Sequence, residues 1–207
     1  MELLLIRHAL PVRHVVVDGA ADPPLSDAGR AQAQHLADYL AHEELHAIYT
    51  SPMRRAIETA APLAAGRDLD PVIVDEVAEW DRNDTEYVPM EELRAANDPR
   101  WQAMLRGEWL AHEESPEEFV GRLVGALERL VAAHSGQRIA VVCHGGVIYG
   151  YLGHVLGLPT AQAFFYPNYT SIHRVAAARS GERSIVTINE TSHLRRTGLP
   201  MGLFQAG

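Results

Sequence analysis

Two histidines follow apolar runs of the sequence directly, where a parallel sheet would place groups that do chemistry. His8, preceded by Arg7, follows the run at residues 2–6, and His144 follows the run at residues 138–143. Residues just past the carboxyl ends of parallel strands line the ligand crevice of such sheets. One loop histidine beside a strand is ordinary, but two at matching places favour a shared site.

The residues near these histidines point to an anion as the ligand. Gly145 and Gly146 lie at the predicted start of a helix, where free N–H groups and the helix dipole favour negative charge. Arg55 lies in the first turn of a helix that we expect Pro52 to open. An arginine there opposes the dipole weakly, so Arg55 fits better beside an anion that it binds with two hydrogen bonds. Arg54 is interpreted as solvated.

Composition limits how such an anion site can be built. All 18 basic residues are arginine, which excludes a phosphate-binding loop with its lysine and every lysine Schiff base. The net charge of −9 argues against a nucleic-acid or anionic-membrane surface. The one cysteine, Cys143, excludes an internal disulfide or a Cys-rich metal site. A zinc hydrolase is disfavoured because neither His-Glu-x-x-His nor Cys-x-x-Cys spacing occurs.

A cluster of acidic residues follows the third predicted strand, between Asp75 and Asp81. Such a cluster is usually a solvated loop. One of its carboxyl groups could instead act as a general acid beside a bound phosphate.

The elements that must position these residues alternate between strands and helices. The chain has 207 residues, of which 47% are hydrophobic and 22% charged, the mix of a globular protein. The predicted strands are 2–6, 46–50, 71–74, 138–143, 170–177 and 184–189, and the predicted helices are 27–41, 52–64, 116–134 and 145–156. This alternation predicts an α/β fold with a mostly parallel sheet.

Two segments and the location of the protein complete the outline. The charged segment 81–116, with Trp101 and Trp109, is expected to form short helices and loops, and the tail 193–207 is expected to be irregular. The apolar runs are too short to span a membrane, and the N-terminus has no basic start or small-residue cleavage site. We therefore expect a cytoplasmic protein.

Motifs spread in order along the chain resemble those of the histidine phosphatase superfamily, also called the phosphoglycerate mutase-like family. Leu-Ile-Arg-His at residues 5–8 resembles its signature strand and Arg-His pair. The other similar motifs are the Pro-Leu-Ser helix start at 24–33, the Ser-Pro-x-x-Arg-Ala element within 49–60, the His-Gly-Gly element within 142–148, and two C-terminal signatures at 168–172 and 189–194.

The resemblance implies a fold and a chemistry. The fold would be one α/β domain over residues 1–207, with three layers, a six-stranded, mostly parallel sheet flanked by helices, and a helical and loop cap at about residues 80–118. Neutral His8 would attack phosphorus and form a phosphohistidine. The phosphoryl group would be held without any metal or other cofactor. The residues implied to bind it are Arg7, Arg55, His144 and Gly145.

The family also implies an acid that protonates the leaving oxygen and then activates water. Glu79 is the predicted acid, because Val77-Ala78-Glu79 fits the Leu-x-Glu spacing of the family. Glu76 is the second candidate and Asp81 a further one. This segment lacks the usual Gly-x-Trp-Glu-Gly continuation.

A departure after the first histidine bears on the activity. Ala9, Leu10 and Pro11 occupy positions where the family usually has Gly, often followed by Glu and Thr or Ser. This disfavours a glycolytic mutase and makes a phosphatase of the phosphatase branch the leading hypothesis. A mutase-like phosphotransferase and a catalytically weak binding or regulatory protein remain the alternatives. The predicted partner is a small-molecule phosphate ester. A phosphoprotein or a homodimer is left open, and neither nucleic acid nor membrane is expected.

Overall fold

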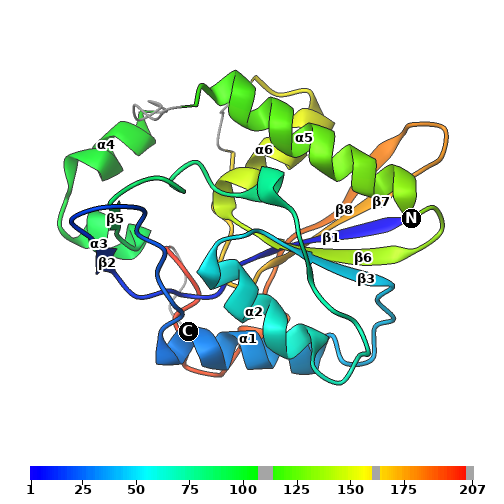
Figure 1. Cartoon of the computed structure of the whole chain (residues 1–207), viewed down its shortest axis with the longest axis horizontal. Coiled ribbons are helices and arrows are strands. Elements are labelled where there is room, and N and C mark those ends of the chain that lie inside the picture. The colour runs from blue at the N-terminus through cyan, green and yellow to red at the C-terminus, as the bar shows by residue number, and fades with distance from the viewer. Residues whose placement is uncertain (107–113, 160–163, 204–207) are drawn as a thin grey trace.

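A six-stranded sheet forms the centre of the molecule (Figure 1). The computed structural model describes residues 1–106, 114–159 and 164–203. Its strands are β1 (Glu2–Arg7), β3 (Ala47–Thr50), β4 (Val72–Ile73), β6 (Arg138–Cys143), β7 (Ile172–Ala177) and β8 (Arg183–Glu190), in the order β4-β3-β6-β1-β7-β8. Neighbouring strands among β4, β3, β6 and β1 are parallel, and β7 is antiparallel to both β1 and β8. The predicted α/β fold with a mostly parallel six-stranded sheet is confirmed.

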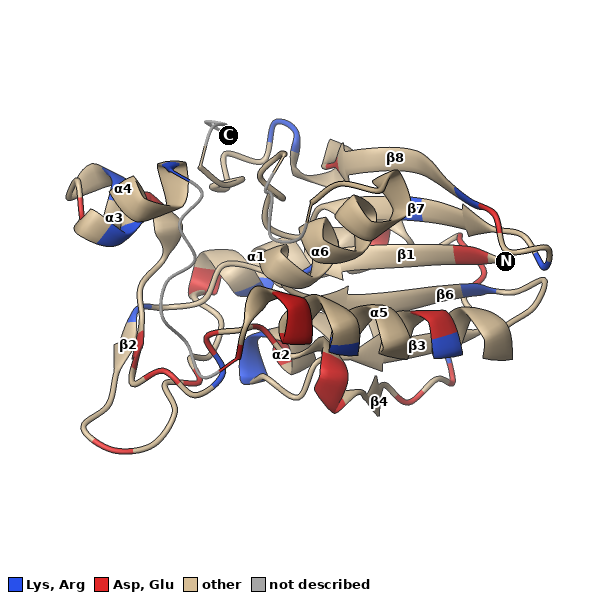
Figure 2. Ribbon diagram, turned by 90° about the horizontal axis from the view of Figure 1, so that it is seen from above, with Lys and Arg blue, Asp and Glu red and all other residues tan. Residues whose placement is uncertain are grey.

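Helices cover both faces of this sheet. They are α1 (Asp27–Tyr39) and α2 (Arg54–Ala64) on one face, and α5 (Pro116–Ala133) and α6 (Gly145–Leu156) on the other (Figures 1 and 2). Successive side chains of a strand point to opposite faces. Leu3 and Leu5 of β1 therefore join the core beneath α5 and α6, and Leu4 and Ile6 join the core beneath α1 and α2. Strand β1, which is buried from Leu3 to Arg7, thus packs against both layers of helices.

Several element boundaries differ from the sequence prediction by one or two residues, and two of them have a clear structural reason. Helix α2 begins at Arg54 rather than at Pro52, because the carboxylate of Asp22, distant in the sequence, accepts a hydrogen bond of 2.9 Å from the Arg54 N–H. Strand β4 is confined to Val72–Ile73 rather than 71–74, because it lies at the edge of the sheet and pairs only with β3.

A cap of small elements lies beyond the carboxyl ends of β1 and β6 (Figure 1). It comprises β2 (His14–Val15), β5 (Glu86–Tyr87), α3 (Met90–Ala95) and α4 (Pro99–Leu105). The antiparallel pairing of β2 with β5 was not predicted from the sequence. Trp101 of α4 packs against Leu93 and Leu203, whereas Trp109 lies outside the described residues.

The segment after β8 connects the sheet to the cap. After a short 3-10 turn at Ser192–Leu194 it is largely irregular to Leu203, as expected for the part of the tail that is described. The Met201 carbonyl accepts a hydrogen bond from the Tyr169 N–H, and the Leu203 carbonyl accepts one from the Arg94 guanidinium. Residues 204–207 lie outside the described part of the chain.

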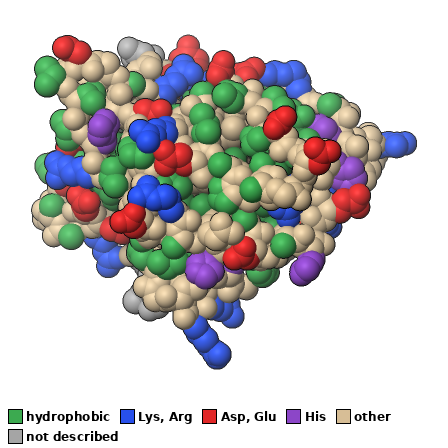
Figure 3. Space-filling model, turned by 60° about the horizontal axis from the view of Figure 1, so that its bottom comes forward, with side chains coloured by type: hydrophobic (Ala, Val, Ile, Leu, Met, Phe, Trp, Pro, Cys, Tyr) green, Lys and Arg blue, Asp and Glu red, His purple; other side chains and the backbone are tan. Residues whose placement is uncertain are grey.

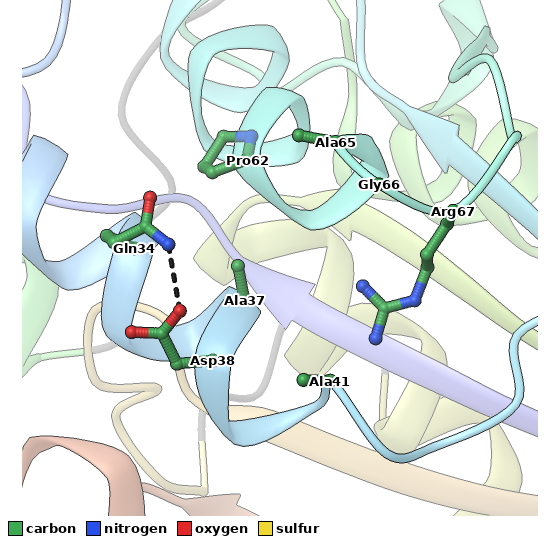
Figure 4. A pocket seen from close by; sticks show the side chains of 8 residues that line it. All are labelled: Gln34, Ala37, Asp38, Ala41, Pro62, Ala65, Gly66 and Arg67. Atoms are coloured by element: carbon green, nitrogen blue, oxygen red, sulfur yellow. Dashed lines mark hydrogen bonds between the residues drawn. The ribbon is translucent and has the colours of Figure 1, made fainter.

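The surface over α1 and α2 carries acidic and basic side chains close to one another (Figure 3). A pocket of about 270 Å³ lies between α1 and the end of α2 (Figure 4). Its lining residues are Gln34, Ala37, Asp38, Ala41, Pro62, Ala65, Gly66 and Arg67, and none of them is a predicted site residue. Within the described ranges, each helix is too short or too polar to cross a bilayer.

Candidate active site

His8 follows the end of β1 immediately and is only 3% exposed. Its Nδ1 lies 2.8 Å from the Ala9 carbonyl oxygen. Because a carbonyl oxygen only accepts hydrogen bonds, Nδ1 carries the proton and Nε2 keeps its lone pair. Burial, followed by the positive charges of Arg55 and Arg7, holds the pKa of His8 well below its ordinary value of 6.5. The ring is therefore neutral at pH 7, and Nε2 has no hydrogen-bond partner among the described residues.

Arg7 and Arg55 are both buried, and each has a buried nitrogen without a hydrogen-bond partner among the described residues. Nη1 of Arg7 donates to the Pro167 carbonyl at 2.6 Å, and Nη2 of Arg55 donates to Asp81 at 2.7 Å. Nε of Arg7 and Nη1 of Arg55 are buried without a partner in the described part of the chain. Because buried donors are normally satisfied, these two nitrogens could bind an anion.

Aromatic rings hold both guanidinium groups in place. The Cζ atom of Arg7 lies 4.2 Å from the ring centroid of Tyr169 and 4.9 Å from that of Tyr166. The Cζ atom of Arg55 lies 4.7 Å from the ring centroid of Tyr87, which β5 of the cap supplies. Cation–π contacts of this kind are stronger when the cation is desolvated, so the cap contributes directly to the position of Arg55.

His144 lies at the end of β6, with its ring centroid 5.2 Å from that of His8. Its Nδ1 accepts a hydrogen bond of 3.3 Å from Nε of Arg55. Its Nε2 therefore donates to Ser51 Oγ at 2.7 Å. Burial, followed by the charge of Arg55, lowers the pKa of His144 well below 6.5. Binding of a phosphoryl oxygen by His144 would replace one of these hydrogen bonds, so that role stays a prediction.

Glu79 is 7% exposed and lies against the start of α6. Its Oε2 accepts a hydrogen bond of 2.7 Å from the Gly146 N–H. Burial and the negative charge of Asp81 raise the pKa of Glu79 to about 7, against the opposing effect of the Gly146 N–H. Glu79 can therefore both give and take a proton near neutral pH. Glu76, the second candidate, is largely at the surface and pairs with Arg129, so the geometry favours Glu79.

The predicted glycines lie beside these groups. A Cβ atom on Gly145 would lie 3.9 Å from Nε of Arg7, which places this residue next to the unpartnered arginine donor. A Cβ atom on Gly146 would lie 2.2 Å from Glu79 Oε1, so the close approach of the carboxylate requires glycine there. Gly145, Arg7, Arg55, His8 and Glu79 are thus gathered at one edge of the sheet.

Sequence reasoning missed several residues that hold this arrangement. The Thr59 hydroxyl accepts a hydrogen bond from the Ala9 N–H at 2.9 Å and donates one to the Arg55 carbonyl at 2.7 Å, which ties the loop after β1 to α2. Ser51 anchors His144. Both lie inside the 49–60 motif, which was the available signal. Tyr169 lies inside the 168–172 motif, whereas Tyr87 and Tyr166 lie outside every motif.

This arrangement suits transfer of an anionic group. It combines an unprotonated imidazole nitrogen, two buried arginines and a carboxyl group that titrates near pH 7. In a phosphate ester, the imidazole nitrogen can attack phosphorus, the arginines can bind the phosphoryl oxygens, and the carboxyl group can protonate the leaving oxygen. Among the described residues, no group of three or more His, Cys, Asp or Glu side chains is arranged to hold a metal ion.

Comparison with known proteins identifies the family. The model of the histidine phosphatase superfamily (branch 1) matches residues 3–191. Phosphoserine phosphatase 1 of Hydrogenobacter thermophilus is 27% identical over 205 residues, which cover 94% of each chain. The uncharacterized phosphatase PhoE of Bacillus subtilis is 30% identical over 139 residues, covering 67% of this chain and 68% of its own.

A solved structure agrees with these sequence relatives. Bacillus stearothermophilus YhfR superposes with a TM-score of 0.75 at 25% identity, covering 93% of this chain and 98% of its own. Sequence and architecture therefore lead to one assignment: this chain belongs to the histidine phosphatase superfamily.

Proposed function

We propose that the protein is a phosphatase that hydrolyses a small phosphomonoester through a phosphohistidine intermediate on His8. One observation carries this proposal: a buried, neutral histidine presents an unprotonated Nε2 beside two buried arginines that each keep a free donor. The family membership and the phosphatases among the relatives support the same activity.

In the first step, Nε2 of His8 attacks phosphorus and a P–N bond forms as the ester P–O bond breaks. Glu79, protonated in a substantial fraction of molecules because its pKa is about 7, gives its proton to the leaving oxygen. Nε of Arg7 and Nη1 of Arg55 donate to the equatorial phosphoryl oxygens, where negative charge accumulates.

In the second step, the Glu79 carboxylate takes a proton from water, and the water oxygen attacks phosphorus. The P–N bond breaks, so inorganic phosphate leaves and His8 returns to its neutral form. Glu79 is then protonated again, ready for the next substrate. The Gly146 N–H keeps the carboxylate at the site in both steps.

Rapid quenching with a radiolabelled ester tests the proposal. We expect a label on His8 that is labile in acid and stable in base, as a phosphoramidate is, and that is abolished by His8→Ala. His42→Ala, at an exposed histidine, is the control and should retain the label. A label on an aspartate or serine peptide would contradict the assignment. A requirement for a bisphosphate primer, with isomerised product, would instead indicate a phosphotransferase.

A further inference from the structure

The cap carries a partly buried acidic side chain that the proposed chemistry does not use. Glu91 comes from α3, and its Oε2 accepts a hydrogen bond of 2.9 Å from the Tyr169 hydroxyl. Its other oxygen, Oε1, is buried without a hydrogen-bond partner in the described part of the chain. An unpaired buried acceptor is costly, and a charged one more so. Oε1 of Glu91 is therefore an unsatisfied acceptor that a hydrogen-bond donor on a ligand could satisfy.

This carboxylate lies close to the proposed phosphate site. The Tyr169 side chain that it binds has its ring centroid 4.2 Å from Cζ of Arg7 and 6.1 Å from the ring centroid of His8. One side chain thus separates Glu91 from both the nucleophile and an anion-binding arginine. The charges of Glu91 and Arg7 attract each other, but no hydrogen bond or ion pair joins the two side chains among the described contacts.

Charge balance indicates what kind of group would complete the site. Arg55 is already paired with Asp81, and a phosphate dianion would engage the remaining capacity of Arg7 and Arg55. Oε1 of Glu91 would then still lack a hydrogen-bond donor.

We propose that Glu91 selects phosphomonoesters whose leaving alcohol carries a cationic amine, that is, aminoalkyl phosphates. The ammonium would donate a charge-assisted hydrogen bond to Glu91 Oε1 while the phosphoryl group binds Arg7 and Arg55. This inference rests on the proposed phosphatase function, and it makes Glu91 a specificity-determining residue supplied by the cap.

A matched pair of substrates tests this selection. Phosphoethanolamine and 2-hydroxyethyl phosphate have the same length and differ in an ammonium or a hydroxyl group. We expect the wild-type kcat/KM to favour the amine at least about tenfold, the effect of one hydrogen bond to a charged group. Glu91→Gln keeps an acceptor for the Tyr169 hydroxyl but removes the charge, so the preference should fall about tenfold or more. Glu92→Gln, on the exposed side of the same helix, should keep the preference.

The outcomes separate this inference from the proposed function. Absence of turnover with both esters and with p-nitrophenyl phosphate would contradict the phosphatase proposal itself. Turnover of p-nitrophenyl phosphate with no wild-type preference for the amine would overturn the role of Glu91 alone. An equal loss for both esters in Glu91→Gln would also overturn it, because a residue that only supports Tyr169 and Arg7 would affect both substrates alike.

Discussion

The carboxylate of Glu79 and the backbone of Gly146 lie in direct contact at the start of α6. Glu79 Oε2 accepts a hydrogen bond of 2.7 Å from the Gly146 N–H, and a Cβ atom on Gly146 would lie only 2.2 Å from Glu79 Oε1. The Gly146 N–H at the start of α6 therefore holds the Glu79 carboxylate in place. The carboxylate can approach this closely only because residue 146 is glycine and has no side chain.

Gly146→Ala should displace the acid without removing it. Because general acid catalysis contributes about 10²–10⁴-fold, we expect kcat/KM for an alkyl phosphate to fall about 10²-fold. Turnover of p-nitrophenyl phosphate should fall less, since p-nitrophenolate leaves without a proton. Gly121→Ala in α5, where a new Cβ atom meets nothing within 4 Å, is the control and should keep wild-type kinetics. Equal losses on both substrates would contradict a displaced acid.

Glu79→Gln should divide the reaction into a fast and a slow half with p-nitrophenyl phosphate. The first half needs no acid for this leaving group, whereas the second half has lost the base that activates water. Stopped-flow absorbance should show a burst of p-nitrophenol followed by a low steady rate, and activity on alkyl phosphates should be largely lost.

Glu76→Gln is the matched control for this experiment, because Glu76 pairs with Arg129 away from Glu79. It should behave like the wild type with both substrates. If Glu76→Gln shows the dependence on leaving group and Glu79→Gln does not, the acid has been assigned three residues too far along the chain. If neither shows it, Asp81 becomes the candidate.

The pH dependence should report the coupling between Glu79 and Asp81. Transfer to His8 needs protonated Glu79, so the alkyl-to-aryl ratio of kcat/KM should fall as pH rises through about 7, the pKa of Glu79. Asp81→Asn removes a negative charge that raises this pKa, and it frees Arg55, whose charge lowers it. The fall should therefore begin at lower pH, as measured over about pH 5–9. A shift to higher pH would contradict the coupling.

Activity should survive chelation. Arg7 and Arg55 supply the positive charge and the free donors that the phosphoryl group needs, so no step of the proposed mechanism uses a metal ion. Exhaustive dialysis against EDTA should leave kcat/KM unchanged. Loss of turnover that a divalent metal restores would contradict this expectation.

The parts of the fold that sequence predicted well are those with long buried runs. Strands β1 and β6 are buried on both faces, so their continuous apolar runs marked them to within one residue. The pairing of β2 with β5 was missed because two residues in each strand give no periodicity. The start of α2 was misplaced because its capping carboxylate, Asp22, lies 32 residues away in the chain.

The candidate site likewise contains residues that sequence motifs predicted and contacts that they did not predict. Motif positions predicted His8, Arg7, Arg55 and Glu79, which the structure brings together. The contact of Arg55 with Asp81 and that of Tyr169 with Glu91 join segments 26 and 78 residues apart. A single sequence carries no pattern that pairs residues so far apart, although Arg55 and Tyr169 each lie within one of the motifs.

The partner that fixes the protonated nitrogen of His8 is a main-chain carbonyl, that of Ala9, rather than a carboxylate side chain. A peptide carbonyl is present whichever residue occupies position 9, so no point mutation removes it. It also brings no negative charge that would favour the imidazolium. The tautomer of His8 therefore does not depend on which side chain occupies position 9. Substitutions in the cap can change the substrate specificity, in evolution or by design, while Nε2 of His8 stays unprotonated.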